Sequence, residues 1–393
     1  QDTLHGKKYN SNTIPKYLKG ESGTNVELQV YRKTNDSLFT VNLKRGDVAI
    51  KSVDVAYMIN DSLVYIKLER FARTSFREFK SALTKLQNSG MNSLILDLRG
   101  NGGGYIDIAQ KIADEFLEDD KLVVYTKDNK GNTENYYTSS RGSFKEGSLY
   151  VLIDQNSASA SEIVAGALQD NDRGTTIGRR SFGKGLVQED RDLGDGSAVR
   201  LTIARYYTPT GRSIQKPYEK GKGEQYSNDI NNRYRNGELL SRDSIKVVDS
   251  LKFTTPKGKI VYGGGGIVPD VFVAIDTTSY LNNFYFNTVQ NFSFDLVDNN
   301  RKQFAKVTLD DFINSYDIEK AYNAYIKRIN TRLTDTRRRL NRTYNPSGKK
   351  AETLKQYLKA TIANQIYGDE GFYRIIQSDD KMLLKVLELE SSN

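Results

Sequence analysis

The spacing of apolar residues predicts a small β element followed by a mixed core. Residues 26–31 alternate between apolar and polar positions, as a half-buried strand does. From about residue 48 onward, segments with a helical spacing of apolar residues alternate with short apolar runs that are typical of buried strands, at residues 63–68, 93–98 and 150–153. This alternation predicts a core of strands and helices.

Two of the predicted core helices have well-defined apolar faces. The first begins at Ser75, and Glu78 follows at the spacing of a capping box. Its apolar face is predicted to consist of Phe76, Phe79, Leu83 and Leu86. The next helix has a comparable face, made of Ile106, Ala109, Ile112, Ala113 and Phe116.

The second half of the chain changes character. Residues 198–207 alternate strongly and predict another strand, whereas residues 216–258 are polar, basic and tyrosine-bearing and predict a mobile surface insertion. From about residue 276 the spacing is helical, and the segment 321–342 is long and basic. We expect a helical domain packed on the core; a dimer or adaptor surface is the functional alternative for this region.

Composition suits a soluble globular protein. The chain has 393 residues, of which 37% are hydrophobic and 27% charged, enough for two or three domains. No apolar run approaches the roughly 18 residues that span a bilayer, so we expect no integral membrane segment in this chain. A net charge of +9 raises the alternative of a nucleic-acid binder. Because no nucleic-acid motif accompanies the charge, we expect no nucleic-acid partner.

Candidate chemistry lies directly after the run at residues 150–153. Ser157, Ser159 and Ser161 alternate with alanines there, before an amphipathic segment at residues 163–168. This order predicts a strand, a tight turn and the start of a helix. A serine on such a turn has an exposed hydroxyl group, and the free N–H groups of a helix N-terminus can stabilise an oxyanion. The bland alternative is a helix N-cap.

A serine nucleophile needs a base, and the chain offers few. Its one histidine, His5, lies in a polar run near the N-terminus, and there is no cysteine. The remaining candidate is a lysine, and Lys184 stands between two glycines whose backbone can bend against a neighbouring element. A lysine acts as a base near neutral pH only when burial or positive charge lowers its pKa. The bland alternative is a surface loop.

A glycine-rich turn follows the strand at residues 93–98. A strand, a glycine turn and a helix also build phosphate-binding loops, so a nucleotide site is an alternative. However, residues 99–104 lack both the Gly-Lys-Ser/Thr ending of a P-loop and the spacing of a dinucleotide motif. We therefore expect no cofactor at this turn.

The serine and lysine motifs together resemble those of the carboxyl-terminal processing peptidases, or tail-specific proteases. Members of this family are serine peptidases with a Ser–Lys dyad on a ClpP/crotonase-like core. The resemblance implies that the middle serine of SASAS, Ser159, is the nucleophile and that the lysine of FGKG, Lys184, is the base. It also implies a role for Gln188, one helical turn beyond the lysine. The separation of 25 residues between Ser159 and Lys184 agrees with the family pattern.

The glycine turn resembles the DLRxNxGG element of the same family, whose backbone donates to the oxyanion. This resemblance assigns one donor to Gly103 or Gly104, with Gly104 preferred, and the second to Ala160. We expect Asp97 and Arg99 to form a structural ion pair near the turn.

The resemblance extends over roughly residues 15–275 and divides the chain. Residues 19–26 resemble the last part of a PDZ domain, whose earlier half is expected upstream of Gln1. The expected domains are the end of a truncated PDZ-like domain at 1–40, a peptidase core at 41–275 and a helical domain at 276–393. The expected fold class is therefore α/β with a helical C-terminal domain.

The expected function is that of a serine endopeptidase that captures the C-terminal region of protein or peptide substrates. Neither a metal nor another cofactor is expected. The family implies export, most often to the bacterial periplasm, with the signal segment outside this chain. Two kinds of partner stay open: a second copy of this chain, which would form a homo-oligomer, and an adaptor protein. The alternative is a non-catalytic peptide-binding protein that retains the crotonase-like fold.

Overall fold

The computed structural model of the chain describes Leu4 and residues 13–32, 36–48, 50–219, 221–278, 281–336 and 345–392. The chain divides into two compact units, Gln1–Lys51 and Ser52–Asn393.

The first unit contains a short helix and a β-hairpin. α1 (Pro15–Leu18) precedes β1 (Asn25–Arg32), which pairs antiparallel with β2 (Ser37–Lys44). Alternate side chains of β1, beginning with Val26, are half-buried and the others are exposed, which confirms the expected strand. The likeness to a PDZ domain stays a prediction.

A six-stranded sheet forms the centre of the second unit. Its strands lie in the order β14 (Val271–Phe272), β9 (Thr175–Gly178), β8 (Ser148–Ile153), β5 (Ser93–Asp97), β4 (Leu63–Leu68) and β3 (Val53–Met58). All neighbours are parallel except β3 and β4. Because parallel strands end at the same edge of a sheet, the loops that follow β5, β8 and β9 meet there. This is where α/β sheets place their sites.

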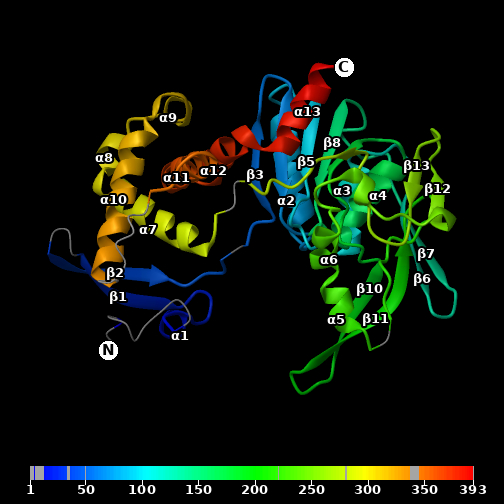
Figure 1. Cartoon of the computed structure of the whole chain (residues 1–393). Helices are drawn as coiled ribbons and strands as arrows, with labels where there is room; N and C mark the ends of the chain where they lie inside the picture. Colours follow the sequence, from blue (N-terminus) through cyan, green and yellow to red (C-terminus); the bar gives the residue numbers. More distant parts are fainter. Residues whose placement is uncertain are drawn as a thin grey trace. The chain divides into compact units, whose positions relative to one another are not determined.

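Helices cover both faces of this sheet (Figure 1). α2 (Ser75–Gln87), α3 (Ile106–Asp114) and α4 (Ala160–Asp170) pack on one face. α13 (Lys381–Ser391) packs on the other through Met382, Leu383 and Val386. The central strands are therefore buried on both sides, which explains their continuous apolar runs.

The second unit contains another, four-stranded sheet. It is antiparallel, in the order β10 (Leu186–Asp192), β11 (Ala198–Tyr207), β6 (Leu122–Asp128) and β7 (Thr133–Tyr137). β11 confirms the strand expected from alternation. Figure 1 shows the β10–β11 hairpin extending away from the six-stranded sheet, and the inner end of β11 buries Tyr206.

The segment 216–258 is largely exposed, in line with the expected surface insertion, but it is folded and a few of its side chains are buried; its mobility stays a prediction. It contains α5 (Gly223–Ser227), α6 (Asp229–Arg235), two 3₁₀ helices (Arg242–Ser244 and Asp249–Leu251) and β12 (Lys252–Thr254), which pairs with β13 (Ile260–Tyr262). Lys216, Arg233 and Leu239 are each only 3% exposed. Lys216 and Arg233 are buried because carboxylates, backbone carbonyls and aromatic rings surround them, whereas other basic residues of the segment, such as Arg235, are exposed.

The C-terminal region is helical, as expected. Its helices are α7 (Asn283–Asn299), α8 (Arg301–Phe304), α9 (Leu309–Ser315), α10 (Ile318–Thr336), α11 (Lys349–Tyr367), α12 (Asp369–Ile376), the 3₁₀ helix Gln377–Asp379 and α13. Helices α7 to α12 share an apolar core of their own, whereas α13 packs on the sheet. The Tyr373 ring of α12 lies 6.4 Å from that of Tyr65 in β4. The predicted fold class, an α/β core with a helical C-terminal region, is confirmed.

Two local predictions for the core helices are wrong. α4 is not amphipathic, because all of its side chains are buried, including Glu162 and Asp170, which have polar partners. The capping box at Ser75 is also absent, since Thr74 is the N-cap of α2. The Glu78 carboxylate instead accepts from the N–H groups at the start of β3.

Candidate active site

The turn after β8 is shaped by its own side chains. The Asp154 carboxylate accepts hydrogen bonds from the N–H groups of Asn156 and Ser157, at 3.0 and 3.1 Å. It accepts a third, also at 3.0 Å, from Gly100 in the loop after β5. An aspartate that binds N–H groups two and three residues on closes a tight turn. The sequence therefore fixes the end of β8 and ties it to the glycine turn, with Ser159 next, at the N-cap of α4.

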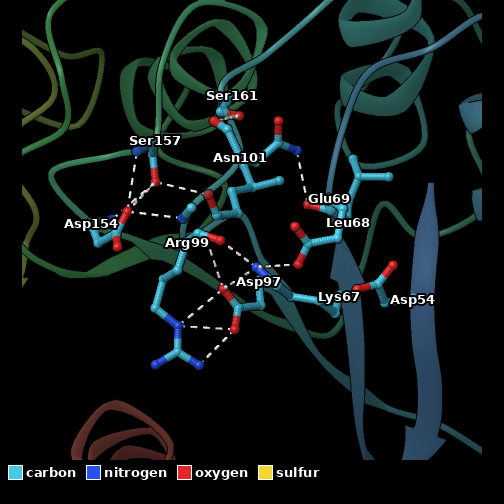
Figure 2. A network of polar contacts seen from close by, with 12 residues as sticks. Asp54, Lys67, Leu68, Glu69, Asp97, Arg99, Asn101, Asp154, Ser157 and Ser161 are labelled. Atoms are coloured by element: carbon cyan, nitrogen blue, oxygen red, sulfur yellow. Dashed lines mark hydrogen bonds and ion pairs between the residues drawn. The ribbon is translucent and has the colours of Figure 1, made fainter. Parts of the chain in front are cut away.

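The three serines differ in what their hydroxyl groups contact. Ser157 is buried and donates to the Leu98 carbonyl at 2.8 Å, and Ser161 is buried and donates to the Asn101 carbonyl at 2.9 Å (Figure 2). The Ser159 hydroxyl donates no hydrogen bond to any residue that the structure describes, and its side chain is partly exposed. Ser157 and Ser161 therefore hold the turn against the glycine loop, whereas the hydroxyl of Ser159 remains open to a substrate.

The backbone at Ser159 is strained. Its φ is 57° and its ψ is −117°, a region that residues other than glycine seldom adopt. Such a conformation costs about 1–3 kcal/mol and persists only where the surroundings hold it. Here the Glu162 carboxylate accepts from the Ser159 N–H at 2.9 Å. Strain of this kind is common at active sites, because it presents one side chain away from the turn.

Gly103 packs directly against this serine. Its φ is +95°, and a methyl group at this position would fall 2.7 Å from the Ser159 Cβ and 2.6 Å from the Ala158 carbonyl. Only glycine can bring the backbone this close. The glycine turn predicted to face the serine therefore lies against it.

The proposed oxyanion donors differ in whether their N–H groups already donate a hydrogen bond. The Gly103 N–H donates to the Asn101 side-chain carbonyl at 2.8 Å, which removes it as a donor to a substrate. The N–H groups of Gly104 and Ala160 donate to no acceptor within the described part of the chain. This difference favours Gly104 over Gly103 as the partner of Ala160.

Lys184 lies in the loop between β9 and β10, and its main chain is tied to that of the serine. The Glu162 carboxylate accepts from the N–H groups of Lys184 and Gly183, at 2.9 and 2.7 Å, and from the Ser181 hydroxyl. One buried carboxylate of α4 thus links the lysine loop to the Ser159 N–H. Between the Ser159 hydroxyl and the Lys184 ammonium, both of which the structure describes, no hydrogen bond is formed.

Tyr206 connects the same two residues from β11. Its hydroxyl lies 3.2 Å from the Ser159 carbonyl and within hydrogen-bonding distance of the Lys184 carbonyl. The side chain is 1% exposed. The candidate nucleophile and base are therefore held at their backbones by one acceptor and one donor, both buried.

The Glu162 carboxyl is easier to protonate than an ordinary glutamate. Burial raises its pKa, and the four hydrogen bonds that it accepts act in the opposite direction without cancelling the effect. A carboxylate accepts at both oxygens, whereas its protonated form must donate at one of them. The link between the serine turn and the lysine loop therefore depends on this group being ionised.

Gln188 lies in a strand and not one helical turn beyond Lys184. It belongs to β10, is exposed, and follows a β-bulge between Val187 and itself. A residue four positions on in an extended chain lies about 13 Å away, rather than one 5.4 Å helical turn. Its amide makes no hydrogen bond to Lys184 in the described structure. His5 lies outside the described residues.

Sequence reasoning missed Glu162 and Tyr206. Glu162 has a local signal, because it stands three residues after Ser159, at the spacing of a capping box, and its carboxylate accepts from the Ser159 N–H as in such a box. Tyr206 has no such signal, since it is brought to the site only by the pairing of β10 with β11.

A polar network supports the glycine turn from below (Figure 2). Asp97 accepts from Arg99 and from the Tyr65 hydroxyl, both at 2.6 Å, and Lys67 lies 3.7 Å away. Arg99 also pairs with Asp380 at the start of α13. Burial opposes the charge of Asp97, but Arg99, Lys67 and these hydrogen bonds lower its pKa to about 2. The expected ion pair of Asp97 and Arg99 is confirmed.

Comparison with known proteins shows which family the core resembles. Residues 62–221 match the model of peptidase family S41. A probable CtpA-like serine protease of Staphylococcus haemolyticus is 34% identical over 245 residues, 61% of this chain and 47% of the relative. A carboxy-terminal-processing protease of Bartonella bacilliformis is 36% identical over 220 residues, 54% of this chain and 50% of the relative. The resemblance read from the motifs is thereby confirmed.

The matches do not extend over whole proteins. The chain spans about half the length of these curated relatives. A solved structure of a photosystem II D1 C-terminal processing protease is 28% identical, with a TM-score of 0.41, over 65% of this chain and 57% of that one. Residues 280–368 match a family of unknown function, DUF8443.

The described residues contain no group of three or more histidine, aspartate or glutamate side chains that could hold a metal ion. In the same part of the chain, every helix is too short or too polar to cross a membrane.

Proposed function

We propose that this chain is a serine endopeptidase that cuts proteins at or near their C-terminal tails. The observation that carries the proposal is the setting of Ser159, which combines a strained N-cap backbone, a hydroxyl open to a substrate and a main chain linked to that of Lys184 through Glu162. The match of residues 62–221 to peptidase family S41 supports the same reaction.

In the proposed mechanism, the Ser159 hydroxyl attacks the scissile carbonyl carbon while the neutral Lys184 amine takes its proton. The oxyanion accepts from the N–H groups of Gly104 and Ala160, each worth about 3–4 kcal/mol in comparable sites. The Lys184 ammonium then gives its proton to the leaving amine. Water, deprotonated by the same amine, hydrolyses the acyl-enzyme, and the proton returns to Ser159.

The reaction requires the two side chains to meet. A base must lie about 2.6–3.2 Å from the proton that it takes, and catalytic hydrogen bonds often tighten only when substrate binds. We propose that Lys184 turns toward Ser159 on substrate binding and that Gln188 then orients its amine. The contacts of Glu162 and Tyr206 with the backbones of Ser159 and Lys184 keep these two residues close enough for this rotation.

We also propose the substrate class and the location. Relatives named carboxy-terminal-processing proteases support substrates that are bound through their C-terminal region. The bacterial origin of these relatives is consistent with an exported, periplasmic protein. The β1–β2 hairpin is proposed to belong to a PDZ-like domain that binds such tails.

The second candidate is a peptide-binding protein without activity. The observation that favours it is the missing hydrogen bond between the Ser159 hydroxyl and Lys184 in the described structure. A binding protein would need no alignment of these groups.

Cleavage of casein separates the two candidates. The protein is compared with Ser159→Ala, Lys184→Ala and His5→Ala, each checked for unchanged circular dichroism. We expect no cleavage with the first two variants and full cleavage with the third. Cleavage that survives Ser159→Ala would contradict the assigned nucleophile, and a wild-type protein that binds casein without cutting it would establish the binding protein.

A further inference from the structure

α6 places one arginine against the loop that carries Lys184. Arg233 is 3% exposed, and its guanidinium donates to the Ser181 carbonyl at 2.7 Å and to the Phe182 carbonyl at 3.2 Å. The Arg180 carbonyl lies at 3.5 Å. Three consecutive carbonyl groups just before Gly183 and Lys184 thus face one planar fork of N–H donors, a geometry that lysine cannot reproduce.

The guanidinium is itself fixed in position. Its Nε lies 2.9 Å from the Asp229 carboxylate, one helical turn earlier in α6, and 3.9 Å from that of Glu238. Glu238 also pairs with Arg180 at 2.5 Å. Two carboxylates therefore lie near the Nε of Arg233 and attract the guanidinium, while its two terminal nitrogens face the loop.

A second contact from the same segment reinforces this clamp. The Lys216 ammonium lies 3.8 Å from the centre of the Phe182 ring and 4.1 Å from that of Tyr226, within the range of cation–π interactions. The Lys216 N–H donates to the Gly183 carbonyl at 2.9 Å. The residue before Gly183 is therefore held by its ring as well as by its carbonyl.

The two sides of the lysine loop are held by groups of opposite charge. Glu162 accepts from the N–H groups of Gly183 and Lys184, and Arg233 donates to the carbonyl groups that precede them. Glu162 fixes the loop relative to Ser159, and Arg233 prevents it from sliding or rotating about that anchor. A displacement of about 1 Å in a catalytic group can lower a rate by about 100-fold.

We propose that Arg233 is a positioning residue for the reaction: it sets the place of the Lys184 amine by clamping the carbonyl groups of residues 180–182. Arg233 lies outside residues 62–221, which match the peptidase family. The inference rests on the proposed function, in which Lys184 is the base.

The test compares Arg233→Ala with Arg235→Ala. Both variants remove one positive charge from α6, but Arg235 is exposed. With casein as the substrate, we expect kcat to fall about 100-fold for Arg233→Ala, with KM changed less than about threefold, and no comparable loss for Arg235→Ala. Added methylguanidinium at concentrations below those that unfold the protein should restore part of kcat in Arg233→Ala alone, because it supplies the same fork of donors.

Hydrogen exchange provides a readout that does not depend on activity. Amides of residues 180–185 should exchange faster in Arg233→Ala, whereas those of β4 should not change. If Arg233→Ala unfolds, Arg233→Lys serves in its place, with a smaller loss of kcat and no rescue, because its ammonium occupies the space.

The outcomes distinguish the two levels of the argument. An inactive Lys184→Ala together with an Arg233→Ala that matches Arg235→Ala, in rate and in exchange, would overturn the clamp and leave the proposed function standing. A fully active Lys184→Ala would overturn both, because no base would remain to be positioned. A uniform rise in exchange without rescue would assign Arg233 to folding stability instead.

Discussion

The turn that carries Ser159 and the loop that carries Lys184 are held in place in different ways. The serine turn is fixed by its own neighbours, Asp154, Ser157 and Ser161, which contact the adjacent glycine turn. The lysine loop is fixed by groups distant in sequence, including Glu162 and Arg233. The side chains that fix the serine turn thus lie beside Ser159 in the sequence, whereas those that fix the lysine loop come from other elements, α4 and α6. When the protein is destabilised, we expect the lysine loop to lose its structure before the serine turn does.

The largest expected effect comes from a buried ion pair between the end of α4 and the segment after β11. Asp170 at the end of α4 and Arg212 are fully buried and lie 2.6 Å apart. Asp170→Asn leaves the arginine without its partner, so the free energy of unfolding should fall by about 3–5 kcal/mol in urea titrations. Asp190→Asn, which removes an exposed pair with Arg200, should change it very little. Equal losses would refute the importance of burial.

Glu162→Gln breaks one of the contacts that link the two halves of the site, the serine turn and the lysine loop. The neutral amide cannot accept from all four donors, and its own N–H groups would face two of them. We expect kcat to fall by about 100-fold while the protein remains folded, since unpaired buried donors cost about 1–3 kcal/mol each. Glu146→Gln, at an exposed position, is the matched control. Unchanged cleavage would mean that the backbone link is dispensable.

Lowering the pH should affect the Asp97 network beneath the glycine turn and the lysine loop at different pH values. The pKa of Asp97 is lowered to about 2 from 3.8, so its contribution to stability, about 2 kcal/mol, is complete above pH 4 and is lost as the pH falls toward 2. Urea titrations of Asp97→Asn should therefore show a smaller decline in stability between pH 4 and 2 than those of the wild type. Asp107→Asn, on an exposed side chain, should leave the decline as it is.

The opposite sign holds for Glu162. Its pKa is raised by burial, so the folded protein takes up this proton at a higher pH than an ordinary glutamate would. Protonation turns one acceptor oxygen of Glu162 into a donor, so the lysine loop is expected to loosen in milder acid than the network around Asp97. As the pH is lowered, hydrogen exchange should increase first for residues 181–185 and only later for residues 98–104; the reverse order would contradict the comparison.

The smallest effect is expected at Gln188. Its side chain is exposed and makes no contact with Lys184 in the described structure, so Gln188→Ala should lower kcat/KM by no more than about tenfold. Assays beside Lys184→Ala measure the difference. A loss as large as that of the lysine variant would show that the glutamine is as necessary as the base itself.

The sequence predicts where the serine turn lies, because the three serines follow an apolar run and precede a helix start. The choice of Ser159 rests on the resemblance to the peptidase family, and that of Lys184 on the same resemblance and on the lack of another base; both stay predictions. Which of three serines is open to a substrate could not be predicted, because that depends on contacts of Ser157 and Ser161 with the glycine turn. Arg233 could not be predicted either, since its fork finds the loop only after α6 packs. Gln188 was placed on a helix because spacing alone does not distinguish a strand.

The covering of the six-stranded sheet by α13 has a consequence for how the protein is made. On a ribosome, β4, β5 and β8 emerge long before Met382, Leu383 and Val386, the residues that cover their second face. Arg99, beside the glycine turn, likewise waits for Asp380. The nascent chain therefore exposes an apolar face of the sheet and an incompletely supported glycine turn until α13 has been synthesised, so the proposed active site is completed late in translation.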